Sequence, residues 1–262
     1  MEWLLIILAG LIQGVTEFIP VSSSGHLALL AALFDFADGF ELYVLANIGT
    51  LGALIWFTRS QLGAMFARVA KGDYSLPAKL LAGILPAGLL GFFLTDFFKW
   101  LGDHLYLVVF MLVAVGAVML FKPPPATDKA AEPAGIGWWK VIIIGLAQVL
   151  ALIPGASRSG VTILAGLWTG LKQELAAHWS FLMSIPLVGG AVLKVLVSSD
   201  GAEFVSRQFG FVLVANLISF VVGLAAITVL MKVISKRSLK VFGIYRMFLG
   251  AVLLGLLLTG VL

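Results

Sequence analysis

The chain lacks cysteine altogether and has few charged residues. None of its 262 residues is a cysteine and only 11% are charged, whereas a soluble domain carries about 25% charged residues. The absence of cysteine excludes disulfides, thiolate nucleophiles and thiolate metal sites. Hydrophobic residues, in contrast, make up 61% of the chain. Because long apolar runs are typical of membrane-spanning helices, the composition predicts an all-α polytopic membrane protein.

The few basic residues gather in three loops that flank apolar runs. The net charge of +4 therefore gives no reason to expect a nucleic-acid partner. The basic loops are 59–79, 122–140 and 232–240. Since cytoplasmic loops are enriched in lysine and arginine, these three are expected inside, and the loops that hold Lys99 and Arg207 are expected outside.

The apolar runs differ in whether they continue far enough to cross a bilayer. Two of them are interrupted, at Pro20 and at Pro154, and each is predicted to form a re-entrant helical hairpin. The proline-rich segment 122–137 reads as a linker. The prediction is a single integral membrane domain over 1–262, with repeat one at 1–121 and repeat two at 138–262. Six transmembrane helices are expected, at 42–57, 80–98, 105–121, 176–197, 209–231 and 241–262.

The two halves resemble one another when they are slid by 135 positions. Each half has three spans, an odd number, so a repeat must insert in opposite orientations, as in many transporters. We therefore expect an inverted-topology repeat, with the first hairpin entering from the outside, the second from the cytoplasm, and their tips meeting near the midplane. The matched pairs are Gly10 with Gly145, Leu11 with Leu146, Gln13 with Gln148, Ser22 with Ser157, Ser24 with Ser159, Gly25 with Gly160 and Leu29 with Leu164.

The first interruption is unusually polar for its setting. It reads Gln-Gly-Val-Thr-Glu-Phe-Ile-Pro-Val-Ser-Ser-Ser-Gly-His over residues 13–26. An ionisable side chain at membrane depth costs roughly 2.5–3.5 kcal/mol, so such residues usually line cavities and mark function. The candidate residues are Glu17, Ser22, Ser23, Ser24, Gly25 and His26.

The second interruption carries the cationic partner. It reads Pro-Gly-Ala-Ser-Arg-Ser-Gly-Val-Thr over residues 154–162. Backbone amides at such turns bind anions, and an arginine offers a planar fork that suits phosphate oxygens. The two interruptions together predict a site for a phosphorylated or diphosphorylated ligand, and the second contributes Ser157, Arg158, Ser159, Gly160 and Thr162.

These two strings resemble the signature motifs of the BacA/UppP undecaprenyl-diphosphate phosphatases. The resemblance extends over essentially the whole chain. It implies a metal-dependent enzyme of the bacterial plasma membrane that removes the terminal phosphate of a polyprenyl diphosphate, with a site open to the outer face and a link to bacitracin resistance. Many members have glutamate at the position of Gln13, so one metal-binding carboxylate is missing here.

By motif position, the expected catalytic residues are Glu17, Ser23, His26 and Arg158. Mg2+, with Ca2+ as an alternative, would bind Glu17, and Gln13 is a candidate second ligand. Ser23 could attack phosphorus after losing its proton to His26, or His26 could attack directly. The remaining polar and glycine residues of both strings would bind the phosphates.

Other interpretations use the same residues. A polyprenyl-phosphate flippase or an anion transporter would need the arginine and the glycine turns but no nucleophile. A second class of membrane lipid phosphatase shares only the fragment Ser24 to His26. That class also needs a later histidine followed by an aspartate, but four residues after His178 this chain has Leu182. Arg158 could also pair structurally with Glu17, a role compatible with phosphate binding. The oligomeric state is open, with a homodimer among the options.

Overall fold

Every secondary-structure element in the described part of the chain is helical. The computed structural model describes residues 2–34, 44–235 and 238–260. The elements in chain order are α1 (Glu2–Thr16), α2 (Ser23–Phe34), α4 (Asn47–Val69), α5 (Ser75–Phe93), α6 (Thr95–Asp103), α7 (Leu105–Leu120), the 3-10 turn η1 (Pro133–Gly135), α8 (Trp138–Leu150), α9 (Arg158–Trp168), α10 (Gln173–Val197), α11 (Ser199–Ile234) and α12 (Lys240–Leu258).

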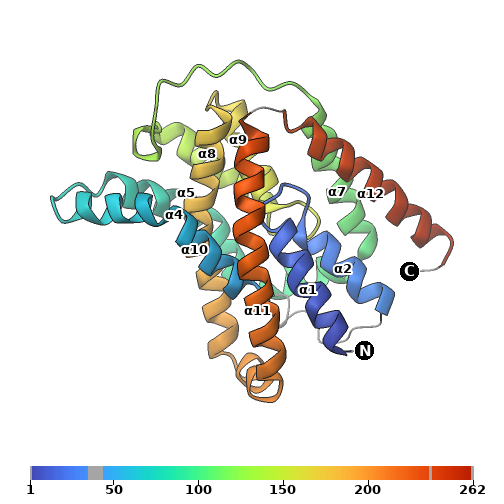
Figure 1. Ribbon diagram of the computed structural model, residues 1–262. Helices are drawn as coiled ribbons and strands as arrows, with labels where there is room; N and C mark the ends of the chain where they lie inside the picture. The colour runs from blue at the N-terminus through green and yellow to red at the C-terminus, as the bar shows by residue number, and fades with distance from the viewer. Residues whose placement is uncertain (1, 35–43, 236–237, 261–262) are drawn as a thin grey trace.

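Helices of each half pack against helices of the other half. Helix α1 runs along α11, α8 runs along α5, and α7 lies beside α12 (Figure 1). The pairs α1–α2 and α8–α9 lie toward opposite ends of the molecule, and the segment before η1 crosses the end near α9 (Figure 1). The arrangement supports an inverted repeat, although the boundaries at 121 and 138 stay a prediction.

Two glycines that are matched by the repeat allow this packing between the halves. A Cβ on Gly10 would lie 2.8 Å from the carbonyl oxygen of Ala215 on α11, and a Cβ on Gly145 would lie 2.6 Å from that of Gly83 on α5. No real Cβ approaches that closely, so only glycine lets each hairpin helix rest directly on the backbone of its neighbour. The two halves therefore use matched residues for the same close approach.

The helices confirm a multi-pass membrane fold but not the expected count of spans. Among the described residues, four helices are long and apolar enough to cross a bilayer (α5, α10, α11 and α12), and α6 with α7, bent by 93°, would make a fifth. Parts of the expected spans 42–57 and 241–262 lie outside the described residues. The figure of six spans therefore stays a prediction.

Local breaks account for two of the helix ends that differ from the sequence-based expectation. The span expected at 80–98 ends at Phe93, where Leu94 leaves the helical conformation (φ −112°, ψ 28°). The hydroxyl of Thr95 donates to the carbonyl of Gly91 (2.6 Å), which satisfies one acceptor at that helix end. Helix α11 begins ten residues before the expected position 209, but it bends at Gln208 (φ −117°, ψ 26°). The expected start thus coincides with the bend.

Candidate active site

The loop between α1 and α2 and the loop between α8 and α9 each hold a serine with an unusual backbone conformation. Ser22 has φ 75° and Ser157 has φ 71°, the two positive values at residues other than glycine among those described. In each loop the serine hydroxyl accepts the N–H of the glycine three residues later, Gly25 or Gly160, at 3.2 Å. These hydroxyls cap the short helices α2 and α9. A left-handed conformation costs a non-glycine residue about 1–2 kcal/mol, and such strain tends to cluster at functional sites.

Glu17 is the centre of the polar cluster between the two loops. Its Oε1 accepts a hydrogen bond from Arg158 Nη2 at 2.6 Å, and its Oε2 accepts from Ser23 Oγ at 2.7 Å and from Gln13 Nε2 at 3.0 Å. The Arg158 and Glu17 side chains are only 11% and 10% exposed. The pairing of the two loops through these residues, expected from the topology, is present in the structure.

The loop backbones also touch directly. Ser24 Oγ accepts the N–H of Gly155 at 3.0 Å, and Ser159 Oγ donates to the main-chain carbonyl of Glu17 at 3.4 Å. Arg158 Nη1 is buried and has no hydrogen-bond partner among the described residues. Because buried polar groups are nearly always paired, this unsatisfied donor indicates a place for an anionic ligand.

His26 lies in a different environment from the one expected. Its Nδ1 lies 2.7 Å from the Ser22 carbonyl oxygen, and its Nε2 lies 2.7 Å from the Tyr245 hydroxyl on α12. The hydroxyl of Ser23 points to Glu17 instead. The structure therefore joins Ser23 to Glu17 and not to His26, because α2 presents the two side chains to different neighbours.

Thr162 also faces away from the carboxylate. Its hydroxyl donates to the Arg158 carbonyl at 2.8 Å and lies 2.7 Å from Ser180 Oγ on α10. Thr162 thus holds the first turn of α9 against α10. Its contacts support Arg158, and its expected part in phosphate binding stays a prediction.

Arg246 is a buried residue beside the site that the sequence interpretation missed. It lies on α12 with no exposed surface, and its guanidinium donates to the carbonyls of Gly155 (2.8 Å) and Ala156 (3.1 Å) on the second loop. It also reaches the carbonyl of Pro20 on the first loop at 3.4 Å. The available signal was a charge inside the apolar run 241–262, and such a charge is by default a functional candidate.

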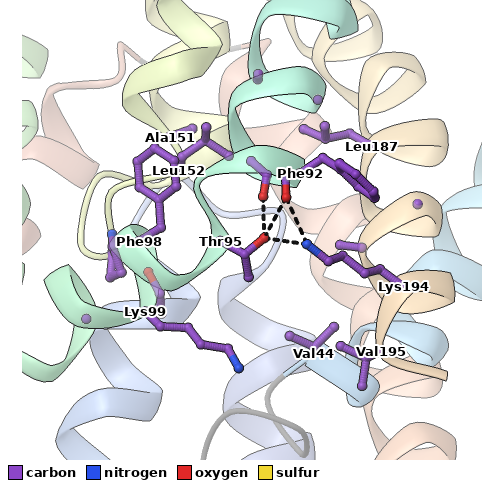
Figure 2. A pocket seen from close by; sticks show the side chains of 18 of the residues that line it. Val44, Phe92, Thr95, Phe98, Lys99, Ala151, Leu152, Leu187, Lys194 and Val195 are labelled. Atoms are coloured by element: carbon purple, nitrogen blue, oxygen red, sulfur yellow. Dashed lines mark hydrogen bonds between the residues drawn. The ribbon is translucent and has the colours of Figure 1, made fainter. Parts of the chain in front are cut away.

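A cavity of about 1060 Å³ begins at the loop tips, where Ser24 and Pro154 line it. Its walls are mostly apolar residues of α2, α5 and α10. On its wall Lys194 donates to the carbonyl of Phe92 (2.9 Å) and to Thr95 Oγ1 (2.6 Å), and Lys99 points into the space nearby (Figure 2). The charged and polar residues that line the cavity include Asp96, Lys99, Asp103, Lys194, Ser198 and Asp200.

Comparison with known proteins places the chain in one family. The family model described as "Bacitracin resistance protein BacA" matches residues 6–252. The chain belongs to the BacA family. A relative from Mycolicibacterium smegmatis named "Undecaprenyl-diphosphatase" is 37% identical over 274 aligned positions, which cover 100% of this chain and 99% of the relative. The family resemblance seen in the two motifs is confirmed.

The residues of the site in this BacA member suit a divalent cation only if phosphate or water oxygens complete its coordination. Among the described residues no three His, Asp or Glu side chains gather in a way that could hold a metal. Gln13 is fully buried, and its Oε1 has no hydrogen-bond partner while its Nε2 binds Glu17. One carboxylate and one unpaired amide oxygen suit Mg2+, which takes few protein ligands and completes its shell with phosphate and water.

Proposed function

We infer that the chain is an undecaprenyl-diphosphatase, which hydrolyses undecaprenyl diphosphate to undecaprenyl phosphate and inorganic phosphate and so recycles the lipid carrier of cell-wall synthesis. The named relative covers the full chain. The observation that carries the inference is the Arg158–Glu17–Ser23 cluster, which unites an anion-binding group, a carboxylate and a hydroxyl. An apolar cavity that starts at the same loop tips suits the isoprenoid chain.

Binding of the diphosphate would exchange one partner of Arg158 for another. In the structure Arg158 Nη2 is paired with Glu17, and Nη1 has no partner among the described residues. A diphosphate can engage both nitrogens through two oxygens, the bidentate geometry that guanidinium favours. Arg158 would then offset charge on the transferred phosphoryl group, and Oε1 of Glu17 would lose its ion-pair partner.

Ser23 is the nucleophile that the hydrogen bonds favour. Its oxygen would attack the terminal phosphorus and its proton would pass to Glu17 Oε2, which lies 2.7 Å away. The P–O bond to the departing undecaprenyl phosphate would break, and water would then hydrolyse the phosphoserine to release phosphate. His26 has both ring nitrogens engaged by Ser22 and Tyr245, so its role would be to orient α2 rather than to attack.

Glu17 and the unpaired Oε1 of Gln13 are the residues that would hold Mg2+, with Ca2+ as the alternative. When bound, the cation would neutralise diphosphate oxygens during transfer.

The proposed location is the bacterial inner membrane with the site open to the periplasmic face. The cavity is also lined by residues around the α5–α6 and α10–α11 turns, which belong to the loops expected outside on charge grounds. The basic loops 59–79, 122–140 and 232–240 are expected inside. One chain supplies every residue of the site, so the proposed chemistry does not require a homodimer.

Phosphate release from purified protein and undecaprenyl diphosphate in detergent tests the function. We expect Ser23→Ala and Arg158→Lys to lower kcat by at least about 100-fold, since each removes a group that acts in the transition state. The exposed residues Ser199 and Arg207 offer matched controls, and Ser199→Ala and Arg207→Lys should retain full activity. A flippase or anion transporter would release no phosphate at all, and that result would overturn the proposal.

A further inference from the structure

We propose that Arg246 is a positioning residue, which turns the N–H of Ser157 toward the bound diphosphate and holds the two loop tips in contact. The proposal rests on the diphosphatase function inferred above. It concerns a side chain on α12, far along the chain from either motif.

The contacts of Arg246 join three segments. Its Nη2 donates to the carbonyls of Gly155 and Ala156, and its Nη1 to that of Pro20. On α7 its Nε donates to the carbonyl of Leu112 at 3.1 Å and its Nη2 to that of Met111 at 3.3 Å, which makes five carbonyl acceptors in all. The guanidinium therefore fixes both loop tips to a single point on the α7–α12 pair.

The direction of these bonds has a consequence for the opposite side of the second loop. In a trans peptide the C=O and the N–H point in opposite directions, and the structure has no cis peptide among the described residues. The Ala156 carbonyl points to Arg246, so the N–H of Ser157 in the same peptide points away from Arg246. Ser157 also has φ 71° with ψ 109°, a strained conformation of the kind that clusters at functional sites. Arg158, the proposed diphosphate ligand, follows directly.

The charge of Arg246 is buried without an acidic partner. In the described part of the chain no carboxylate forms an ion pair with it, and its acceptors are main-chain carbonyls. A buried and unpaired cation is costly for stability. Since burial of this charge lowers the stability of the fold, we attribute the presence of Arg246 to the loop geometry that it imposes.

Arg246→Lys and Arg246→Gln separate this role from a purely structural one. Lysine keeps the charge but, with one nitrogen, cannot serve five carbonyls spread around a planar fork. Glutamine removes the charge as well. Arg207→Lys, at an exposed arginine of α11, is the matched control. Two quantities are measured for each protein in detergent: kcat and KM for phosphate release, and direct calorimetric binding of methylenediphosphonate, a diphosphate analogue that cannot be hydrolysed.

We expect Arg246→Lys to lower kcat by about 100-fold, the usual effect of losing one oriented oxyanion donor. Binding of methylenediphosphonate should weaken by about 10-fold, as expected for a lost charge-assisted contact. Arg246→Gln should show both effects at least as strongly, and Arg207→Lys should show neither.

Wild-type binding and kcat in either folded variant would overturn the proposal. So would a failure of both variants to fold, which would assign Arg246 to the fold alone, or a wild-type protein that does not bind the analogue. The proposed function fails separately, if the wild-type protein binds the analogue but releases no phosphate from the lipid diphosphate.

Discussion

Replacement of Ser157 by glycine and by alanine tests the strained backbone of the second loop. Alanine keeps the left-handed conformation (φ 71°) but loses the cap that the serine hydroxyl gives to the Gly160 N–H. A lost cap costs about 1 kcal/mol with alanine and a few tenths with glycine. Glycine also removes the cost of the left-handed conformation, about 1–2 kcal/mol. Against this, glycine loses more backbone entropy on folding, about 0.5–1 kcal/mol.

The balance is that Ser157→Gly should be more stable than Ser157→Ala by about 1 kcal/mol. For a chain of this size that difference corresponds to roughly 2–4 °C in Tm. Thermal unfolding in detergent, followed by the fluorescence of the seven tryptophans, measures it. Ser22, with φ 75° and the equivalent cap to Gly25, should give the same order.

Ser206 is the control, because it is exposed inside α11. There glycine should be less stable than alanine by about 1 kcal/mol, the ordinary helix preference. If alanine proved equal or superior to glycine at both Ser157 and Ser22, the strain argument would be refuted.

Three further perturbations follow from the packing and the site. Gly49→Ala should cost about 1–3 kcal/mol of stability, because its Cβ would meet the Asn216 carbonyl. Gly190→Ala, inside α10 where a Cβ meets nothing within 4 Å, should instead raise stability by about 1 kcal/mol, the ordinary helix preference. Tyr245→Phe removes the hydrogen bond to His26 and should lower kcat by about 5-fold, equivalent to about 1 kcal/mol. Gln13→Glu should lower the Mg2+ concentration needed for half-maximal phosphate release; an unchanged requirement would remove Gln13 from the proposed metal site.

The sequence by itself determined the class of fold and the partners across the site. Charged residues are too costly in a bilayer to occur by accident, so Glu17 and Arg158 were visible as functional candidates in an apolar chain. The charge asymmetry of the loops and the 135-residue repeat predicted hairpins from opposite sides, and hence the contact between these two residues. The structure shows that contact at 2.6 Å.

Only the tertiary structure decided the direction of the hydrogen bonds and the role of distant helices. Ser23 and His26 are three residues apart, and the sequence suggested a nucleophile and its base, but α12 engages His26 through Tyr245 while Ser23 donates to Glu17. In the sequence Arg246 is a single charge within the apolar run 241–262, whereas in the structure its guanidinium bonds to both loops. A hydrogen bond depends on ångström-scale placement, which comes from packing of segments far apart in the chain and leaves no periodic trace in the sequence.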